Sequence, residues 1–140
     1  MPTADLQPTL PPDVAARLDE AVRRIVEIAG PQLVILFGSY AEGTANEDSD
    51  IDLLVVAETE RLIATEVLLS RALREVFGPL AFDLVVHTPD WWEKARRVRG
   101  FVAREADRKG VRLYEPAPIA GPAFTISSRP PTPPPARTRL

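Results

Sequence analysis

Residues 33–56 read LVILFGSYAEGTANEDSDIDLLVV, and this stretch predicts the centre of a β-sheet. The continuous apolar run 33–37 is typical of a strand that is buried on both faces. A second strand, 50–56, begins with acidic residues and is otherwise apolar. The polar segment between the two strands starts with a glycine and a serine. We therefore expect two buried strands joined by a polar loop that lies at one end of the sheet.

Two helices are expected around these strands. The first follows Pro11-Pro12-Asp13 and ends at Gly30-Pro31, and its apolar stripe consists of Val14, Leu18, Val22, Ile25 and Ala29. The second covers residues 59–77 and ends at Gly78-Pro79, with a stripe formed by Leu62, Leu69, Leu73 and Val76.

The segment that follows predicts a strand, a helix and a second strand. Residues 81–87 are expected to form the third strand of the sheet. A single helix is expected from Pro89 to a C-cap at Gly110, with apolar residues at Trp91, Ala95, Val98 and Val102. Residues 111–114 are expected to form a short edge strand. The order α-β-β-α-β-α-β predicts a compact α/β fold in which helices flank a small mixed sheet.

The ends of the chain differ from this domain in composition. The chain has 140 residues and 15 prolines, and eight of these prolines lie in 116–140. Proline cannot sustain a ladder of backbone hydrogen bonds, so we expect a disordered or polyproline II tail there. Residues 1–11 are expected to form a flexible arm, which leaves 12–115 as the folded domain.

Composition excludes several classes of protein. The chain has no cysteine, so disulfide frameworks, zinc knuckles and thiol nucleophiles are excluded, and its single histidine rules out a histidine cluster for a metal. The net charge of −3 includes +3 from the tail, so the remaining 115 residues carry −6, which argues against direct nucleic-acid binding. No apolar run approaches the roughly 20 residues that span a bilayer, and no signal peptide is visible, so we expect a cytoplasmic protein with no membrane contact.

The loop and the second strand carry the residues that suit phosphate chemistry. Gly38 and Ser39 follow a buried strand, where a glycine lets the backbone approach a ligand closely and amides and a hydroxyl can hold phosphate oxygens. Asp50 and Asp52 are two residues apart on a strand, so both side chains point to the same face. A divalent cation such as Mg²⁺ would explain two like charges at this position.

A third carboxylate is expected nearby. Asp83 lies in the otherwise apolar strand 81–87. If this strand pairs with the strand of Asp50 and Asp52, three carboxylates converge, which suits two Mg²⁺ ions and an in-line phosphoryl displacement. Asp83 could also accept the proton of an attacking hydroxyl.

These residues resemble a known family. Gly38-Ser39, ten intervening residues and then Asp50-Ile51-Asp52 match the G-S-x10-D-x-D signature of the DNA polymerase β-like nucleotidyltransferases. Residues 12–115 resemble in particular the minimal nucleotidyltransferases, small proteins that are often encoded beside a toxin with a HEPN domain.

The resemblance implies a role for each of these residues. Gly38 and Ser39 would bind the phosphates of a nucleoside triphosphate. Asp50, Asp52 and Asp83 would be the catalytic residues and would coordinate two Mg²⁺ ions. The reaction would transfer AMP from ATP to a hydroxyl of a partner protein, a tyrosine of a HEPN toxin in the antitoxins of this family, and would release pyrophosphate.

Glu42 departs from the family pattern. The family often has Ala-Arg-Gly after the glycine-serine turn, where this chain has Ala41-Glu42-Gly43. The segment 38–52 consequently contains five acids and no base, which affects nucleotide affinity and rate more than the fold. Two alternatives therefore stay open: transfer to a small molecule such as an aminoglycoside, and a non-catalytic antitoxin that masks its partner by contact.

Three further features have both a structural and a functional interpretation. His87 ends the third strand and is interpreted as structural, with proton transfer as the alternative. Of Trp91 and Trp92, one is expected in the core, and the other is a candidate anchor for a partner. Five arginines are expected on a solvated helix face, with contact to an acidic partner or a nucleotide as the alternative: Arg96, Arg97, Arg99, Arg104 and Arg108.

Overall fold

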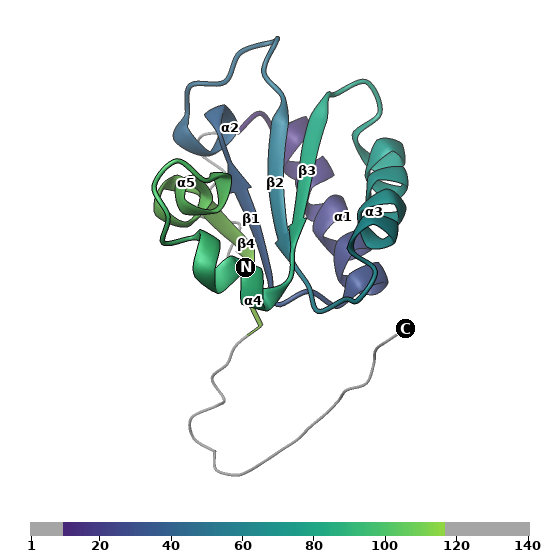
Figure 1. Ribbon diagram of the computed structural model, residues 1–140. Coiled ribbons are helices and arrows are strands. Elements are labelled where there is room, and N and C mark those ends of the chain that lie inside the picture. Colours follow the sequence, from purple (N-terminus) through teal and green to yellow (C-terminus); the bar gives the residue numbers. More distant parts are fainter. Residues whose placement is uncertain (1–9, 117–140) are drawn as a thin grey trace.

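The computed structural model describes residues 10–116, which form a four-stranded sheet with helices on both faces (Figure 1). In chain order the elements are α1 (Pro12–Ala29), β1 (Leu33–Phe37), α2 (Ser39–Glu42), β2 (Ile51–Val56), α3 (Leu62–Phe77), β3 (Phe82–His87), α4 (Pro89–Ala95), α5 (Val102–Lys109) and β4 (Val111–Tyr114). The predicted α/β class with a small mixed sheet is confirmed. The predicted disordered tail (116–140) and flexible arm (1–11) fall outside the described residues, apart from positions 10, 11 and 116.

The two buried strands lie at the centre of the sheet, as expected. The strand order is β3-β2-β1-β4. β1 runs antiparallel to both of its neighbours, whereas β2 and β3 are parallel. A parallel pair needs a crossover connection, and α3 provides it. β4 lies at one edge, as expected, and β3 forms the other.

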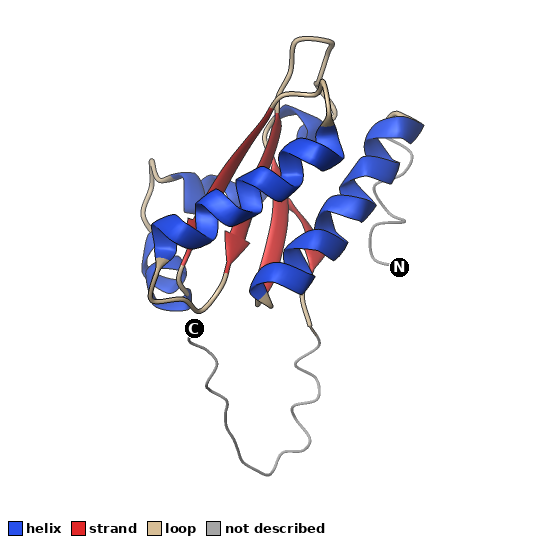
Figure 2. Ribbon diagram, turned by 90° about the vertical axis from the view of Figure 1, so that its right-hand side faces the viewer, coloured by secondary structure: helices blue, strands red, loops and turns tan. Residues whose placement is uncertain are grey.

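Each face of the sheet has its own hydrophobic core. Alternate residues of a strand point to opposite faces, so β1 and β2 contribute to both cores. On one face, α1 and α3 lie side by side across the sheet (Figure 2) and pack on Val34, Leu36, Leu53 and Val55. On the other face, α4 and α5 pack on Leu33, Ile35, Leu54 and Val56.

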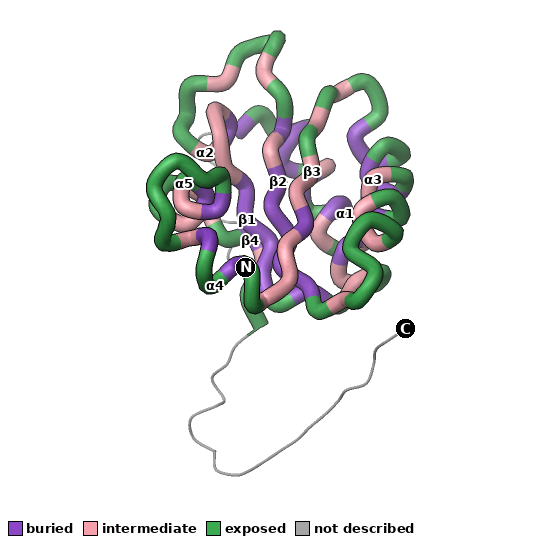
Figure 3. Tube along the Cα trace, in the orientation of Figure 1, coloured by how far each residue is buried: buried purple, intermediate pink, exposed green. Residues whose placement is uncertain are grey.

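The face under α4 and α5 is only partly covered. α5 lies against β1, and α4 contacts β3. β1 and β2 are almost entirely buried, whereas most residues of β3 are intermediate or exposed (Figure 3). This leaves part of β3 open on the face that carries α4 and α5.

The prediction of a single helix over 89–110 is wrong. The chain instead forms α4 and α5, joined by a turn in which Gly100 has a φ of +95°, a backbone conformation that glycine adopts readily. The expected apolar stripe is wrong as well, except at Ala95, which is buried. The two short helices bury Trp92 and three alanines, while Trp91, Val98 and Val102 are 45%, 43% and 46% exposed.

Smaller differences concern the ends of elements. α2 was not predicted, because four residues are too few to show helical periodicity. α3 begins at Leu62 rather than at residue 59, since the Thr59 hydroxyl accepts a hydrogen bond from the Arg61 amide and holds a turn there. β2 and β3 each begin one residue later than expected. None of the helices within 10–116 has the length and apolar character needed to cross a membrane.

Gly110 fixes how closely α5 approaches the sheet. A Cβ atom at this position would collide with the Ala106 carbonyl, the Ile35 side chain and the Leu36 carbonyl. We expect Gly110→Ala to lower the free energy of unfolding by about 1–3 kcal/mol in urea titrations, because backbone atoms cannot move aside. Gly30→Asn is the control, since nothing lies within 4 Å of a Cβ there and asparagine tolerates the left-handed conformation of this C-cap. Equal losses in the two variants would contradict the tight contact at Gly110.

Candidate active site

The glycine turn after β1 lies directly against Asp52. Gly38 has a φ of +78°, which favours glycine. A Cβ at Gly38 would overlap the Asp52 carboxylate. The Gly38 carbonyl accepts hydrogen bonds of 3.0 and 3.1 Å from the amides of Ala41 and Glu42, which start α2 at Ser39. Position 38 therefore requires glycine for two reasons: the backbone has a positive φ, and the Asp52 carboxylate occupies the space that a Cβ would need.

Asp52 and Asp83 are direct neighbours across the sheet. In the parallel β2–β3 pair, Asp52 is in register with Asp83, and on its other side Asp52 faces Phe37 of β1. Both aspartates lie on the face covered by α4 and α5, because Leu54 and Val85, two residues further along each strand, belong to the core on that face. The strand of Asp83 therefore lies beside the strand of Asp52, which is the pairing on which the predicted site depended.

The electrostatics of the site centre on Asp52. Its pKa rises from the ordinary 3.8 to about 6 because the carboxyl is partly buried and because the negative charges of Asp83 and Asp50 lie close to it. Asp83 is exposed, and so is Asp50, which immediately precedes β2. The ionised form of Asp52 is therefore disfavoured in the folded protein, and that cost falls when a cation or a proton arrives.

The loop before Asp50 is held by its own hydrogen bonds. The Asn46 Oδ1 accepts a hydrogen bond of 2.8 Å from the Asp48 backbone amide. The Asn46 backbone amide donates one of 2.9 Å to the Ser49 hydroxyl. The Ile51 amide donates to the Ala81 carbonyl at 2.9 Å, which fastens the end of the loop to the segment before β3. Glu42, Glu47 and Asp48 are exposed around this loop, as expected.

The donor set suits a hard cation. Within residues 10–116, no three acidic or histidine side chains are arranged as a complete metal-binding cluster. Mg²⁺ commonly uses one or two carboxylates and takes its other ligands from water and substrate phosphates. Asp52 and Asp83 offer such a pair. Burial and the neighbouring carboxylates raise the pKa of Asp52, and a bound cation would favour its ionised form.

His87 lies on the same face as Asp83, at the other end of β3. Its Nδ1 is 3.1 Å from the Val86 carbonyl, and its ring meets Trp91 edge-on with 6.3 Å between the ring centroids. Burial lowers the pKa of His87 below its ordinary value of 6.5, so the ring is neutral at pH 7. This packing agrees with the structural interpretation of His87.

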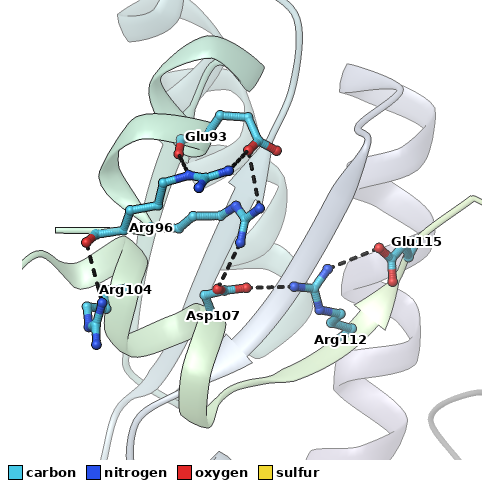
Figure 4. Close-up of polar contacts among 7 residues, drawn as sticks. Glu93, Arg96, Arg104, Asp107, Arg112 and Glu115 are labelled. Atoms are coloured by element: carbon cyan, nitrogen blue, oxygen red, sulfur yellow. Dashed lines mark hydrogen bonds and ion pairs between the residues drawn. The ribbon is translucent and has the colours of Figure 1, made fainter. Parts of the chain in front are cut away.

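Several of the arginines expected on a solvated face have structural partners (Figure 4). Asp107 accepts hydrogen bonds from Arg96 at 3.2 Å and from Arg112 at 2.8 Å. Glu93 accepts from Arg96 at 3.2 Å. Asp107 therefore ties α4, α5 and β4 together. No short sequence pattern indicates this contact, because its members come from elements that only the tertiary fold brings together.

An aromatic pair lies beside His87, at the end of β3 away from the carboxylates. Trp91 packs on Phe101, with 5.9 Å between the ring centroids. Both rings are more than 40% exposed. The sequence indicated one exposed tryptophan, but it did not indicate Phe101, because that residue reaches Trp91 only through the turn between α4 and α5.

Comparison with known proteins identifies the family. A family model described as a nucleotidyltransferase domain matches residues 16–115, which include every residue of the candidate site. The chain belongs to the nucleotidyltransferase family. The predicted family is confirmed, and so is the predicted enzyme class, nucleotidyltransferase.

One relative by sequence and one structural neighbour add detail to this assignment. It is 54% identical over 43 residues to a Methanocaldococcus jannaschii protein named "Putative protein adenylyltransferase MJ1305". That match spans 29% of this chain and only 29% of the length of the relative. The fold is similar to that of a chain in a structure described as "Crystal structure of the toxin-antitoxin with AMP-PNP", with a TM-score of 0.51 and 26% identity. The similarity covers 69% of this nucleotidyltransferase and 72% of that chain.

The raised pKa of Asp52 predicts how stability depends on pH. Below pH 3.8 the carboxyl is protonated in both the folded and the unfolded state. Between about 4 and 6 the unfolded state releases its proton first, so stability falls as pH rises, and the loss is complete above about pH 6.

Asp52→Asn removes this loss. We expect the variant to be more stable than the wild type by about 1 kcal/mol at pH 7.5, a figure reduced for solvent screening, and equally stable at pH 4. Urea unfolding of the metal-free protein at the two pH values measures the difference. A variant that is equally stable or less stable at pH 7.5 would show that Asp52 is not under electrostatic strain.

Proposed function

We propose that this protein transfers AMP from ATP to a hydroxyl group of a partner protein and acts as the antitoxin of a toxin–antitoxin pair. The observation that carries the proposal is the juxtaposition of Asp52, Asp83 and the Gly38 turn. Carboxylates that face each other across two parallel strands, beside a glycine turn that can admit phosphate, suit nucleotidyl transfer.

The phosphate groups of the nucleotide belong at the Gly38 turn in this proposal. Gly38 lets the turn approach the Asp52 carboxylate closely, and Ser39 contributes a hydroxyl and a backbone amide at the start of the helix that follows. Because segment 38–52 contains no lysine or arginine, the charge of a triphosphate would have to be balanced by cations.

Asp50, Asp52 and Asp83 would hold Mg²⁺, with two ions as the expected number. When bound, the metal neutralises phosphate charge and polarises the phosphate that is transferred. The carboxylates themselves position the reacting groups. Asp52 is central because it contacts the turn on one side and faces Asp83 on the other.

The reaction forms one bond and breaks one. The acceptor hydroxyl oxygen attacks the α-phosphorus of ATP, and a new oxygen–phosphorus bond forms. The bond between the α-phosphorus and the oxygen that bridges it to the β-phosphate breaks, and pyrophosphate leaves with the electron pair. The hydroxyl proton passes to the exposed carboxylate of Asp83. The side chain of the partner protein gains AMP.

A tyrosine hydroxyl on a HEPN-type toxin is the acceptor that we propose. Two comparisons support a protein acceptor in a toxin–antitoxin setting: the name of the archaeal relative and the description of the structural neighbour. A nucleotide as donor is supported by the AMP-PNP named in that description. We place the reaction in the cytoplasm, where ATP is available.

One observation favours a second candidate function. Glu42 is exposed beside the site in a segment that lacks basic residues, which disfavours a triphosphate. A non-catalytic antitoxin would bind and mask its partner by contact alone. In that case substitution of Asp52 or Asp83 would leave neutralisation of the toxin unchanged.

Substitution of the paired carboxylates tests the proposal. We expect Asp52→Asn and Asp83→Asn each to lower AMP transfer roughly 100-fold or more, because each removes a group that acts on the transferred phosphate. Intact-mass spectrometry of the protein encoded by the adjacent gene, incubated with ATP and Mg²⁺, detects the added AMP. Asp19→Asn on the exposed side of α1 is the matched control. Transfer at the wild-type rate by either site variant would refute the assignment.

Reversing the charge of Glu42 tests the electrostatic argument. We expect Glu42→Arg to lower the Kd for ATP roughly 3- to 10-fold at low salt, with a smaller effect at high salt because exposed charges are screened. Calorimetric titration in the presence of Mg²⁺ measures the affinity. Glu27→Arg makes the same charge change on α1 and serves as the control. An unchanged Kd for Glu42→Arg would place the triphosphate away from this loop.

A further inference from the structure

A continuous surface leads from the carboxylates along β3 to an aromatic pair. Asp83 and His87 lie on the same face of β3, about 13 Å apart at roughly 3.3 Å per residue. His87 meets Trp91 edge-on, and Trp91 packs on Phe101. Since α4 and α5 leave β3 partly open (Figure 3), this path is accessible to another molecule.

Phe101 also lines a groove along α5. The groove has a volume of about 430 Å³ and is lined by Phe101, Val102, the Gly100 turn, Glu105 and four basic residues, Arg99, Arg104, Arg108 and Lys109. The groove follows the solvent side of α5, because the sheet side of this helix is formed by the buried Ala103 and Ala106. The aromatic pair and the groove therefore share Phe101 and form one surface, which the open part of β3 connects to Asp83.

The groove is basic on an otherwise acidic molecule. Residues 89–112 contain eight basic and four acidic side chains, whereas the first 115 residues together carry −6. Arg96, Arg97 and Arg112 are engaged in ion pairs with Glu93, Asp107 or Glu115. Within residues 10–116, Arg99 and Arg108 form no ion pair. Their charges are available to a ligand.

We propose that the aromatic pair Trp91–Phe101 and the groove with Arg99 and Arg108 form the docking surface for the partner protein, and that they receive an acidic segment next to the acceptor residue. Charge complementarity selects an acidic segment. The exposed rings and the neighbouring Val98 and Val102 provide the apolar centre typical of protein interfaces. The part of this proposal that concerns the acceptor residue rests on the proposed function, whereas the binding of an acidic segment does not.

A protein segment fits this surface better than a nucleic acid does. A nucleic acid would extend beyond the groove and meet the acidic residues on the rest of the chain, whose repulsion acts over about 10 Å at ordinary ionic strength. A short acidic segment presents its charge only where the basic side chains lie. It can also reach Asp83, because β3 provides an open edge beside the aromatic pair.

Synthetic peptides test the proposal. Two fluorescein-labelled 12-residue peptides share a central tyrosine and leucine, and carry either four glutamates or four lysines on one side. We expect the glutamate peptide to bind at least tenfold more tightly in anisotropy titrations of the full chain. We expect the double variant Arg99→Glu/Arg108→Glu to abolish this preference and Trp91→Ala to weaken binding of the glutamate peptide at least fivefold.

Arg71→Glu on the exposed side of α3 is the control for charge reversal, and its binding should match that of the wild type. Thermal melts exclude loss of fold in each variant. In addition, Trp92→Phe leaves Trp91 as the sole tryptophan, and its fluorescence should change when the glutamate peptide binds. Equal affinity for both peptides, or a preference that survives the arginine reversal, would overturn the proposal.

Further outcomes separate this proposal from its competitors. Displacement of the glutamate peptide by ATP alone, or tighter binding of a 12-nucleotide single-stranded RNA that the arginine reversal abolishes, would overturn it in favour of a triphosphate or RNA site. Selective binding of the glutamate peptide without AMP transfer to any tyrosine would support the docking surface while the proposed reaction fails. Transfer to both peptides at equal rates would support the reaction and overturn the docking surface.

Discussion

The register between β2 and β3 is the constraint on which the candidate site depends. It places Asp52 beside Asp83, and partial burial together with the charge of Asp83 raises the pKa of Asp52. Because side chains in a strand alternate between faces, a shift of one residue would move a carboxylate to the opposite core. The buried apolar residues of β2 prevent such a shift, so the two hydrophobic cores also hold the charged pair in place.

The sequence predicted the sheet and most of the site because these features depend on local patterns. The apolar run of β1, the aspartates of β2 and the acid within β3 are visible in short windows, and the pairing of the last two follows from the order of elements. The break between α4 and α5 was missed because apolar residues at helical spacing continue through it. Only packing shows that Trp92, not Trp91, faces the core.

Two kinds of contact could not be read from the chain. Asp107 links α4, α5 and β4 through Arg96 and Arg112 (Figure 4), and nothing in the spacing of these residues indicates that they meet. Gly38 was expected to admit a phosphate, but its closeness to the Asp52 carboxylate depends on how β1 and β2 are aligned. Both contacts arise from tertiary alignment, which a single sequence does not encode in any short window.

Asp83, one of the two paired carboxylates, lies on a strand that has a neighbour on one side only. β3 is the edge of the sheet, and edge segments open locally at lower free energy than central strands do. The repulsion between Asp52 and Asp83 acts across the pairing of β2 with this edge strand, so a cation or proton that relieves the repulsion also strengthens that pairing. Occupation of the site and the stability of the β3 edge are therefore coupled.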